Sequence, residues 1–188
     1  MQNYQLRITL ANIEPRIWRR IVVPGSVTLA KLHNIIQIAM GWGNDHLYLF
    51  TVVREQYGEG MGASTDFSES KVSNAKRVEL QDVALRKGAK LLYEYDMGDG
   101  WEHQLVVEKI ADGAPEAIRC LEGARACPPE DCGGPFGYAE LLEIISDPEH
   151  PECEDRRAWL GEDFSPEDFD LAAVNRRLGR LKVRSTAA

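Results

Sequence analysis

The stretch YEYDMGDGWEH, residues 93–103, decides how this chain folds. Strand-forming aromatic residues lead into a cluster of glycine and aspartate, and strand-forming residues follow it, which is the pattern of a β-hairpin. Glycine at Gly98 tolerates the positive φ that tight hairpin turns require. With Gly98 and Asp99 at the centre of the turn, the stretch predicts two antiparallel strands at the heart of a sheet.

The same register predicts which side chains share a face of the sheet. Asp96 then lies opposite Trp101, and Glu94 lies opposite His103, so that all four point to one side. Two carboxylates and an imidazole beside an indole are compatible with three roles. They can bind a divalent metal ion, act as an acid–base pair, or form a simple cross-strand ion pair.

Alternating apolar and polar residues extend the sheet outward from the hairpin. A helix with one apolar face is predicted to begin after the N-cap Thr28. Strands dominate the first two thirds of the chain and helices the last third, which predicts an α+β fold with a mostly antiparallel sheet, one early helix and a C-terminal helical segment. The expected strands cover residues 4–15, 17–24, 46–53, 90–96 and 101–110, and the expected helices cover residues 29–42, 137–150, 151–161 and 164–181.

Two further segments carry local signals. The last helix is expected to start at Ser165 as N-cap, with Pro166 at its first position and Asp168 completing a capping box. Residues 55–77 are rich in glycine, serine and charge without periodicity, which predicts a mobile loop. The whole chain, residues 1–188, is expected to form a single domain.

The composition limits the classes of protein to which this chain can belong. With 44% hydrophobic and 28% charged residues, the chain resembles a globular protein. It contains no apolar run near the ~20 residues of a membrane helix and no secretion signal at its start, so we expect a cytoplasmic protein without membrane contact. Its four cysteines are then expected to be reduced thiols.

The net charge of −8 is unevenly distributed. An acidic total argues against a general nucleic-acid-binding protein, since phosphate neutralisation supplies most non-specific affinity. A local basic face on the N-terminal half leaves DNA contact open. The basic residues of that half are Arg7, Arg16, Arg19, Arg20, Lys31 and Arg54.

A second candidate region surrounds three cysteines, Cys120, Cys127 and Cys132. They could bind zinc, with Cys153, His150 or His103 as a fourth ligand, although the spacing is not a paired Cys-x-x-Cys signature. They could equally be buried thiols or redox-active groups.

The loop that follows the cysteines, Pro128–Gly137, holds Glu130 and Asp131 and leads into a helix that begins near Tyr138. Its glycines allow the backbone to approach a ligand closely. It lacks the Lys-Ser/Thr of a nucleotide P-loop. On the strand at residues 46–53, His46 could join the hairpin if the two strands pair.

The blocks HLYLF, YEYDMGDGWEH and CPPEDCGGPFGY resemble the signature blocks of the plasmid pRiA4b ORF-3-like family, and the later DPEHPE and FDLAAVNRRL resemble its C-terminal blocks. The resemblance runs from about Tyr4 to about Leu181. It implies a compact α+β domain and an association with plasmids and mobile elements, and it supplies no catalytic residues. The matching positions are His46, Asp96, Gly98, Asp99, Trp101, His103, Pro128, Pro129, Glu130, Gly133, Gly134, Gly137 and Tyr138.

These observations lead to one favoured function and two alternatives. The favoured function is a non-enzymatic domain that binds a small molecule or a protein. The alternatives are a metal-dependent hydrolase or nuclease and a DNA-binding accessory protein of a transposable element. The only cofactor considered is a divalent metal ion. The candidate ligand-binding residues are Asp96, Asp99, Trp101, His103, Glu130, Asp131 and Tyr138, and the candidate metal ligands are His46, Glu94, Asp96, His103, Cys120, Cys127 and Cys132.

Overall fold

The hairpin at residues 93–103 lies in the middle of a mixed sheet. The computed structural model describes residues 2–59, 72–113, 117–161 and 163–181, and within them eight strands form one sheet in the order β5-β4-β3-β6-β7-β1-β2-β8. All neighbouring strands are antiparallel except β4 and β5. The strands are β1 (Gln2–Leu10), β2 (Trp18–Pro24), β3 (Tyr48–Val52), β4 (Glu55–Gly58), β5 (Val72–Asn74), β6 (Lys90–Tyr95), β7 (Trp101–Asp112) and β8 (Arg119–Ala124).

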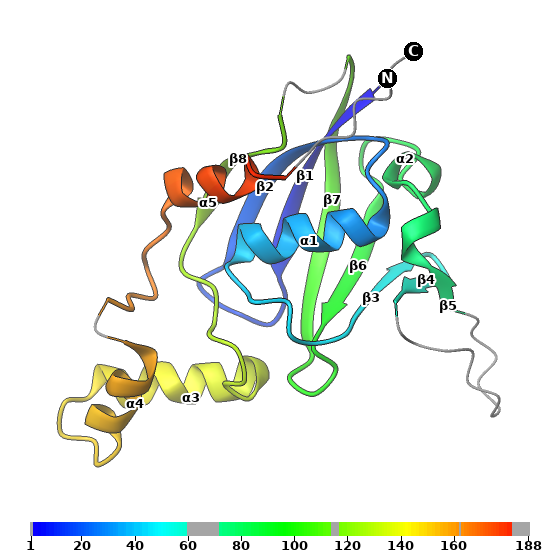
Figure 1. Ribbon diagram of the computed structural model, residues 1–188. Helices are drawn as coiled ribbons and strands as arrows, with labels where there is room; N and C mark the ends of the chain where they lie inside the picture. The colour runs from blue at the N-terminus through cyan, green and yellow to red at the C-terminus, as the bar shows by residue number, and fades with distance from the viewer. Residues whose placement is uncertain (1, 60–71, 114–116, 162, 182–188) are drawn as a thin grey trace, which may run out of the picture.

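Helices cover one face of this sheet, which confirms the predicted α+β class. Figure 1 shows α1 lying across the near face with α5 beside it, and the two helices contact each other. The helical elements are α1 (Leu29–Met40), η1 (Ala75–Arg77), α2 (Leu80–Val83), α3 (Gly134–Ser146), α4 (Cys153–Leu160) and α5 (Leu171–Leu178). None of the helices in the described part of the chain is long and apolar enough to cross a membrane.

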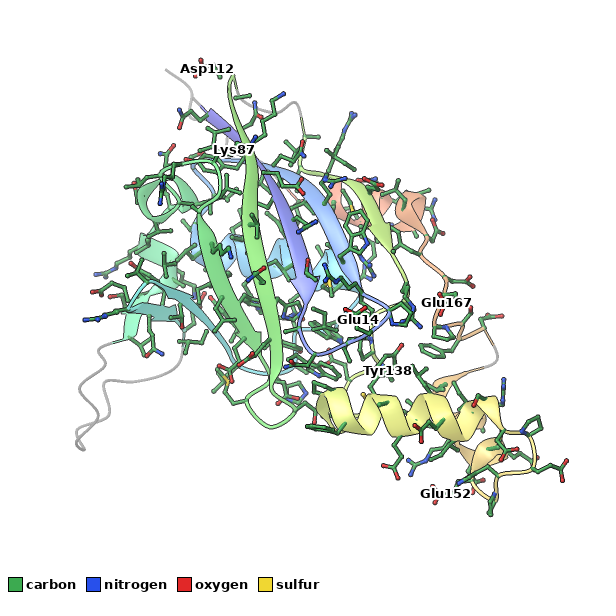
Figure 2. All side chains as sticks on the ribbon, turned by 180° about the vertical axis from the view of Figure 1, so that it is seen from behind. Glu14, Lys87, Asp112, Tyr138, Glu152 and Glu167 are labelled. Atoms are coloured by element: carbon green, nitrogen blue, oxygen red, sulfur yellow. The ribbon has the colours of Figure 1, made fainter. Side chains whose placement is uncertain are left out.

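The core lies between α1 and the sheet. In β1 every second side chain, at Leu6, Ile8 and Leu10, is buried, and the side chains between them are only half-buried. The opposite face, which faces the viewer in Figure 2, is polar and carries an ion-pair group in which Glu108 contacts Arg7 and Arg20. This one-sided burial is the usual arrangement of an antiparallel sheet.

Helix α1 begins where its sequence predicts and ends two residues earlier than predicted. The Thr28 hydroxyl accepts a hydrogen bond from the Lys31 backbone at 3.2 Å, so that Thr28 caps the helix. Gly41 ends the helix with a φ of +112°, a conformation that glycine adopts without a steric penalty.

The predicted register of the central hairpin is wrong by one residue. Tyr95 pairs with Trp101 and Tyr93 with His103, and residues 96–100 form the turn. A slip of one residue moves every side chain to the other face. The aromatic side chains therefore gather in the core, where their large apolar area is buried.

The register removes the polar patch that the sequence suggested. Glu94 pairs with Glu102 on the face opposite to His103, so the predicted Glu94–His103 pair does not form. Asp96 leaves the strand altogether, with a φ of +54° in the turn.

The C-terminal helix starts later than predicted. The Asp170 carboxylate accepts from the Ala173 backbone at 2.8 Å, and α5 begins at Leu171. Ser165 and Pro166 lie in the preceding turn and do not begin a helix. Leu171, Val174 and Leu178 pack against the core, so the helix begins with this apolar stripe and is capped by Asp170 in place of Ser165.

The predicted mobile loop at residues 55–77 is structured at both ends. Residues 55–58 form β4, and residues 72–77 form β5 and η1. Residues 60–71 of that prediction lie outside the described residues.

Candidate functional site

Three segments meet at the end of the β6–β7 hairpin: residues 43–47 after α1, the turn at residues 96–100, and the loop at residues 128–134 before α3. The Gly43 backbone donates to the Glu130 carboxylate at 2.8 Å, and the Gly133 backbone donates to Asp99 at 3.2 Å. In Figure 1 the β6–β7 turn lies beside the first turn of α3. Strands β3 and β6 pair, the condition under which the sequence allowed His46 to join the hairpin, and His46 Nε2 lies 3.7 Å from Asp96 Oδ2.

The His46 imidazole lies between two aspartates from the other two segments. Its Nε2 atom is 3.3 Å from Asp131 Oδ1 and 3.7 Å from Asp96 Oδ2. One ligand atom from each of the three residues falls within 4.8 Å of the others. Ligands of a tetrahedral metal at ~2.1 Å are about 3.4 Å apart, so this spacing suits a metal ion.

Asp96 is held in place through its own backbone. Its amide donates to the Leu47 carbonyl at 2.9 Å, and its Oδ1 atom accepts from the Gly98 amide at 2.9 Å. The Oδ2 atom is thereby left toward His46. Both Asp96 and Asp131 have positive φ, +54° and +56°, a backbone strain that aspartate tolerates better than most residues and that is frequent at functional sites.

Glu130 borders this group and fixes its loop. Its Oε1 atom accepts from the Gly43 amide at 2.8 Å and from the Tyr95 hydroxyl at 3.1 Å, while its Oε2 atom is 4.0 Å from His46 Nε2. Burial, and then the Glu130 charge, raise the pKa of Tyr95 to about 12. Tyr95 therefore stays protonated and continues to donate to Glu130 at neutral pH.

The aromatic candidates lie beneath the site. Trp101 and His103 are both 0% exposed, and Tyr138 is also buried. The Trp42 indole donates to the Pro128 carbonyl at 2.9 Å and stacks on Tyr95 with ring centroids 4.9 Å apart. These rings support the loop that presents Glu130 and Asp131, and His103 does not join the His46 group.

The cysteines do not converge on a metal-sized group within the described residues. All four are free thiols. Burial raises the pKa of Cys127 and raises that of Cys132 to about 12, so both are protonated at neutral pH. The sequence allowed these cysteines to be zinc ligands, buried thiols or redox-active groups, and this environment favours buried thiols.

The predicted basic face of the N-terminal half is largely neutralised. Arg19 is buried, Arg7 and Arg20 contact Glu108, and Arg16 contacts Glu14. This pairing does not favour contact with a DNA backbone.

Tyr95 and the Gly43 amide are contributors that the sequence analysis missed. Tyr95 looked like an ordinary strand residue, and the β3–β6 pairing that brings His46 close to it links segments far apart in the chain. Asp131 was predicted as a ligand-binding residue, and the structure brings it into the group with His46 and Asp96.

Two buried histidines predict a pH-dependent stability. Burial lowers the pKa of His33 and of His103 to about 4. The unfolded chain binds these protons near pH 6.5. Between pH 6.5 and about 4 the unfolded state therefore holds more protons, and the free energy of unfolding falls as the pH falls, by up to about 1.4 kcal/mol per pH unit for each histidine.

Urea unfolding at pH 7 and pH 5 measures this slope, and His103→Phe is expected to reduce it by about half. Glu108, whose pKa is lowered mainly by its hydrogen bond to Arg20, adds to this loss as the pH approaches the ordinary glutamate value of 4.5, which lies below the two pH values compared. An unchanged slope in the variant would contradict the assignment of the slope to His103.

Comparisons with known proteins agree with this fold. The model of the family described as plasmid pRiA4b ORF-3-like protein matches residues 2–173. The uncharacterized protein y4hQ of Sinorhizobium fredii is 39% identical over 173 residues, covering 91% of this chain and 85% of that protein. The crystal structure of protein of unknown function MM3350 from Methanosarcina mazei Go1 is 37% identical, with a TM-score of 0.78 over 91% of this chain and 96% of that one. The chain belongs to the plasmid pRiA4b ORF-3-like family.

Proposed function

We propose that this plasmid pRiA4b ORF-3-like protein is a binding domain whose ligand is a divalent metal ion, held by His46, Asp96 and Asp131. The observation that carries the proposal is the convergence of one imidazole nitrogen and two carboxylate oxygens within 4.8 Å. The three donors come from three separate segments. These donors therefore come together at the end of the hairpin only when the domain is folded.

The donor set selects the class of ion. One imidazole nitrogen and two carboxylate oxygens suit zinc, manganese, iron(II) or cobalt better than calcium, which prefers six or more oxygen ligands. The separations of 3.3 and 3.7 Å from His46 Nε2 suit metal–ligand bonds of about 2.1 Å. Glu130 would orient the loop through its Oε1 atom, which accepts two hydrogen bonds.

A second candidate function, metal-dependent hydrolysis, is favoured by the exposure of the site. The Asp131 side chain is 74% exposed, so coordination positions on its side would face solvent. A metal ion that keeps a water in such a position lowers the pKa of that water and supplies a nucleophile. The association of this chain with mobile elements, and contact with DNA, stay predictions.

Isothermal titration of metal-free, full-length protein with Zn²⁺ and Mn²⁺ tests the proposal. His46→Ala and Asp96→Asn are each expected to weaken the affinity by about 100-fold or more, because the first removes one of three ligands and the second replaces a charged carboxylate with a neutral amide. His150→Ala is the matched control, since it removes an imidazole outside the group, and it is expected to leave the affinity unchanged. Equal losses in His46→Ala and His150→Ala, or no binding by the unaltered protein, would refute the metal site.

A further inference from the structure

A hollow between α3 and α4 opens next to the proposed metal site. Figure 2 shows the two helices extending away from the sheet, with Glu152 at the far end and Tyr138 at the end near the sheet. The hollow has a volume of about 340 Å³, at the lower end of the range for small-ligand pockets. Asp131 lines it and also belongs to the His46 group, so the two sites are neighbours.

The walls of the hollow combine an apolar floor with an accessible indole. Leu141 and Ile144 on α3 are buried and form the floor. Trp159, on the last turn of α4, lines the hollow and is 51% exposed. A half-exposed indole offers its ring face to a partner, and the face of tryptophan is the best aromatic surface for a cation.

The carboxylates that line the hollow outnumber its arginines. Asp131 and Glu140 are both exposed carboxylates that line it. Glu140 has no ion pair or hydrogen bond from its side chain to another described residue. The cation in the hollow, Arg156, is already engaged, because its Nε and Nη2 atoms donate to Glu152 at 3.1 and 2.8 Å.

The helices that form the hollow also carry a negative net charge, since the segment 134–160 contains seven acidic residues and two arginines. A surface of this kind attracts positively charged partners.

We propose that the hollow between α3 and α4 binds an arginine or lysine side chain of a basic peptide segment. The cation would lie over the Trp159 ring and would donate charge-assisted hydrogen bonds to Glu140. An anionic ligand fits less well, because Arg156 would have to leave Glu152 and the anion would face two carboxylates. This proposal does not depend on the metal site, and it goes beyond it by naming a partner.

Titration calorimetry with an acetylated, amidated tetra-arginine peptide, on metal-free protein, tests the proposal. Trp159→Leu keeps an apolar side chain but removes the ring face, and it is expected to weaken binding about fivefold. Glu140→Gln removes one charge from the hollow and is expected to weaken binding about tenfold. Glu143→Gln makes the same change on the same helix, outside the hollow, and is expected to stay within about twofold of the unaltered protein.

Thermal unfolding of each variant checks that the fold is intact, which the exposure of all three side chains favours. The proposal is overturned if Glu140→Gln and Glu143→Gln weaken binding equally, because the attraction is then diffuse. It is also overturned if Trp159→Leu has no effect, if the peptide does not bind, or if a tetra-glutamate peptide binds as well. Because no metal is present, failure here is distinguishable from failure of the metal site.

Discussion

A Gly134→Ala protein is expected to unfold with a free energy about 3 kcal/mol lower than that of the unaltered chain. A Cβ atom at this position would lie 2.2 Å from the Asp99 carbonyl oxygen, and the residue has a φ of +69°. The left-handed conformation costs about 1 kcal/mol for alanine, and overpacking adds about 1–3 kcal/mol. The contacting atom is backbone, so it cannot rotate away.

Gly41→Ala is the matched control for this substitution. Gly41 also has a positive φ, +112°, but a Cβ atom there would meet nothing within 4 Å. Its expected cost is about 1 kcal/mol, the conformational part alone. Urea unfolding of both variants separates the two contributions. If the two variants lose equal stability, the close approach of α3 to the hairpin turn does not stabilise the fold.

Gly134→Ala is also expected to weaken metal binding. Gly134 begins α3 and follows Asp131 by three residues, so moving the helix from the turn separates Asp131 from Asp96. Titration of Gly134→Ala with Zn²⁺ is expected to give at least a tenfold weaker affinity, while Gly41→Ala keeps the original affinity.

Arg19→Met is expected to lower the free energy of unfolding by about 4 kcal/mol. Arg19 is 1% exposed, and its guanidinium donates to four backbone carbonyls, with distances of 2.8–2.9 Å. Burial lowers its pKa, but a guanidinium stays charged at neutral pH. Methionine has no donor, so each carbonyl loses its partner at about 1 kcal/mol or more. The carbonyls belong to Trp18, Ala39, Ala124 and Arg125.

Arg20→Met is the control for Arg19→Met. Arg20 is the next residue of β2, but its side chain is 26% exposed and pairs with Glu108 at the polar face of the sheet. An ion pair of this kind contributes up to about 1 kcal/mol. Equal losses of unfolding free energy in the two variants, measured by urea unfolding, would show that the buried guanidinium is not a main contributor to the stability of the fold.

Arg19 also links the core to the candidate site. Its bonds to Ala39 and Arg125 join the last turn of α1 to the segment that leads into the loop at residues 128–134. Loss of these bonds is therefore expected to reduce metal affinity as well as stability.

The sequence predicted the class of fold because local patterns determine it. The alternation in β1, the cap at Thr28 and the glycine-rich turn each depend on neighbouring residues alone. The register of the hairpin depended on the length of its turn, which the pattern of Asp96, Gly98 and Gly100 left open. A five-residue turn in place of a two-residue centre reversed the faces of Glu94 and Asp96 relative to His103.

The candidate site was predicted in part for the same reason. His46 and Asp96 were predicted as metal ligands, and Asp131 as a ligand-binding residue. Their meeting depends on the pairing of β3 with β6 and on the return of the 128–134 loop, both of which are long-range contacts. Three of the cysteines share a short stretch of sequence, yet no group with the spacing of metal ligands includes a cysteine in the part of the chain that is described.

The central claim, that His46, Asp96 and Asp131 hold a metal ion, is tested most directly by anomalous diffraction from crystals soaked in Zn²⁺. An anomalous peak is expected about 2.0–2.2 Å from His46 Nε2, Asp96 Oδ2 and Asp131 Oδ1, and no peak is expected at this position in crystals of His46→Ala. A peak only at other residues, or no peak in crystals that diffract well after soaking, would contradict it.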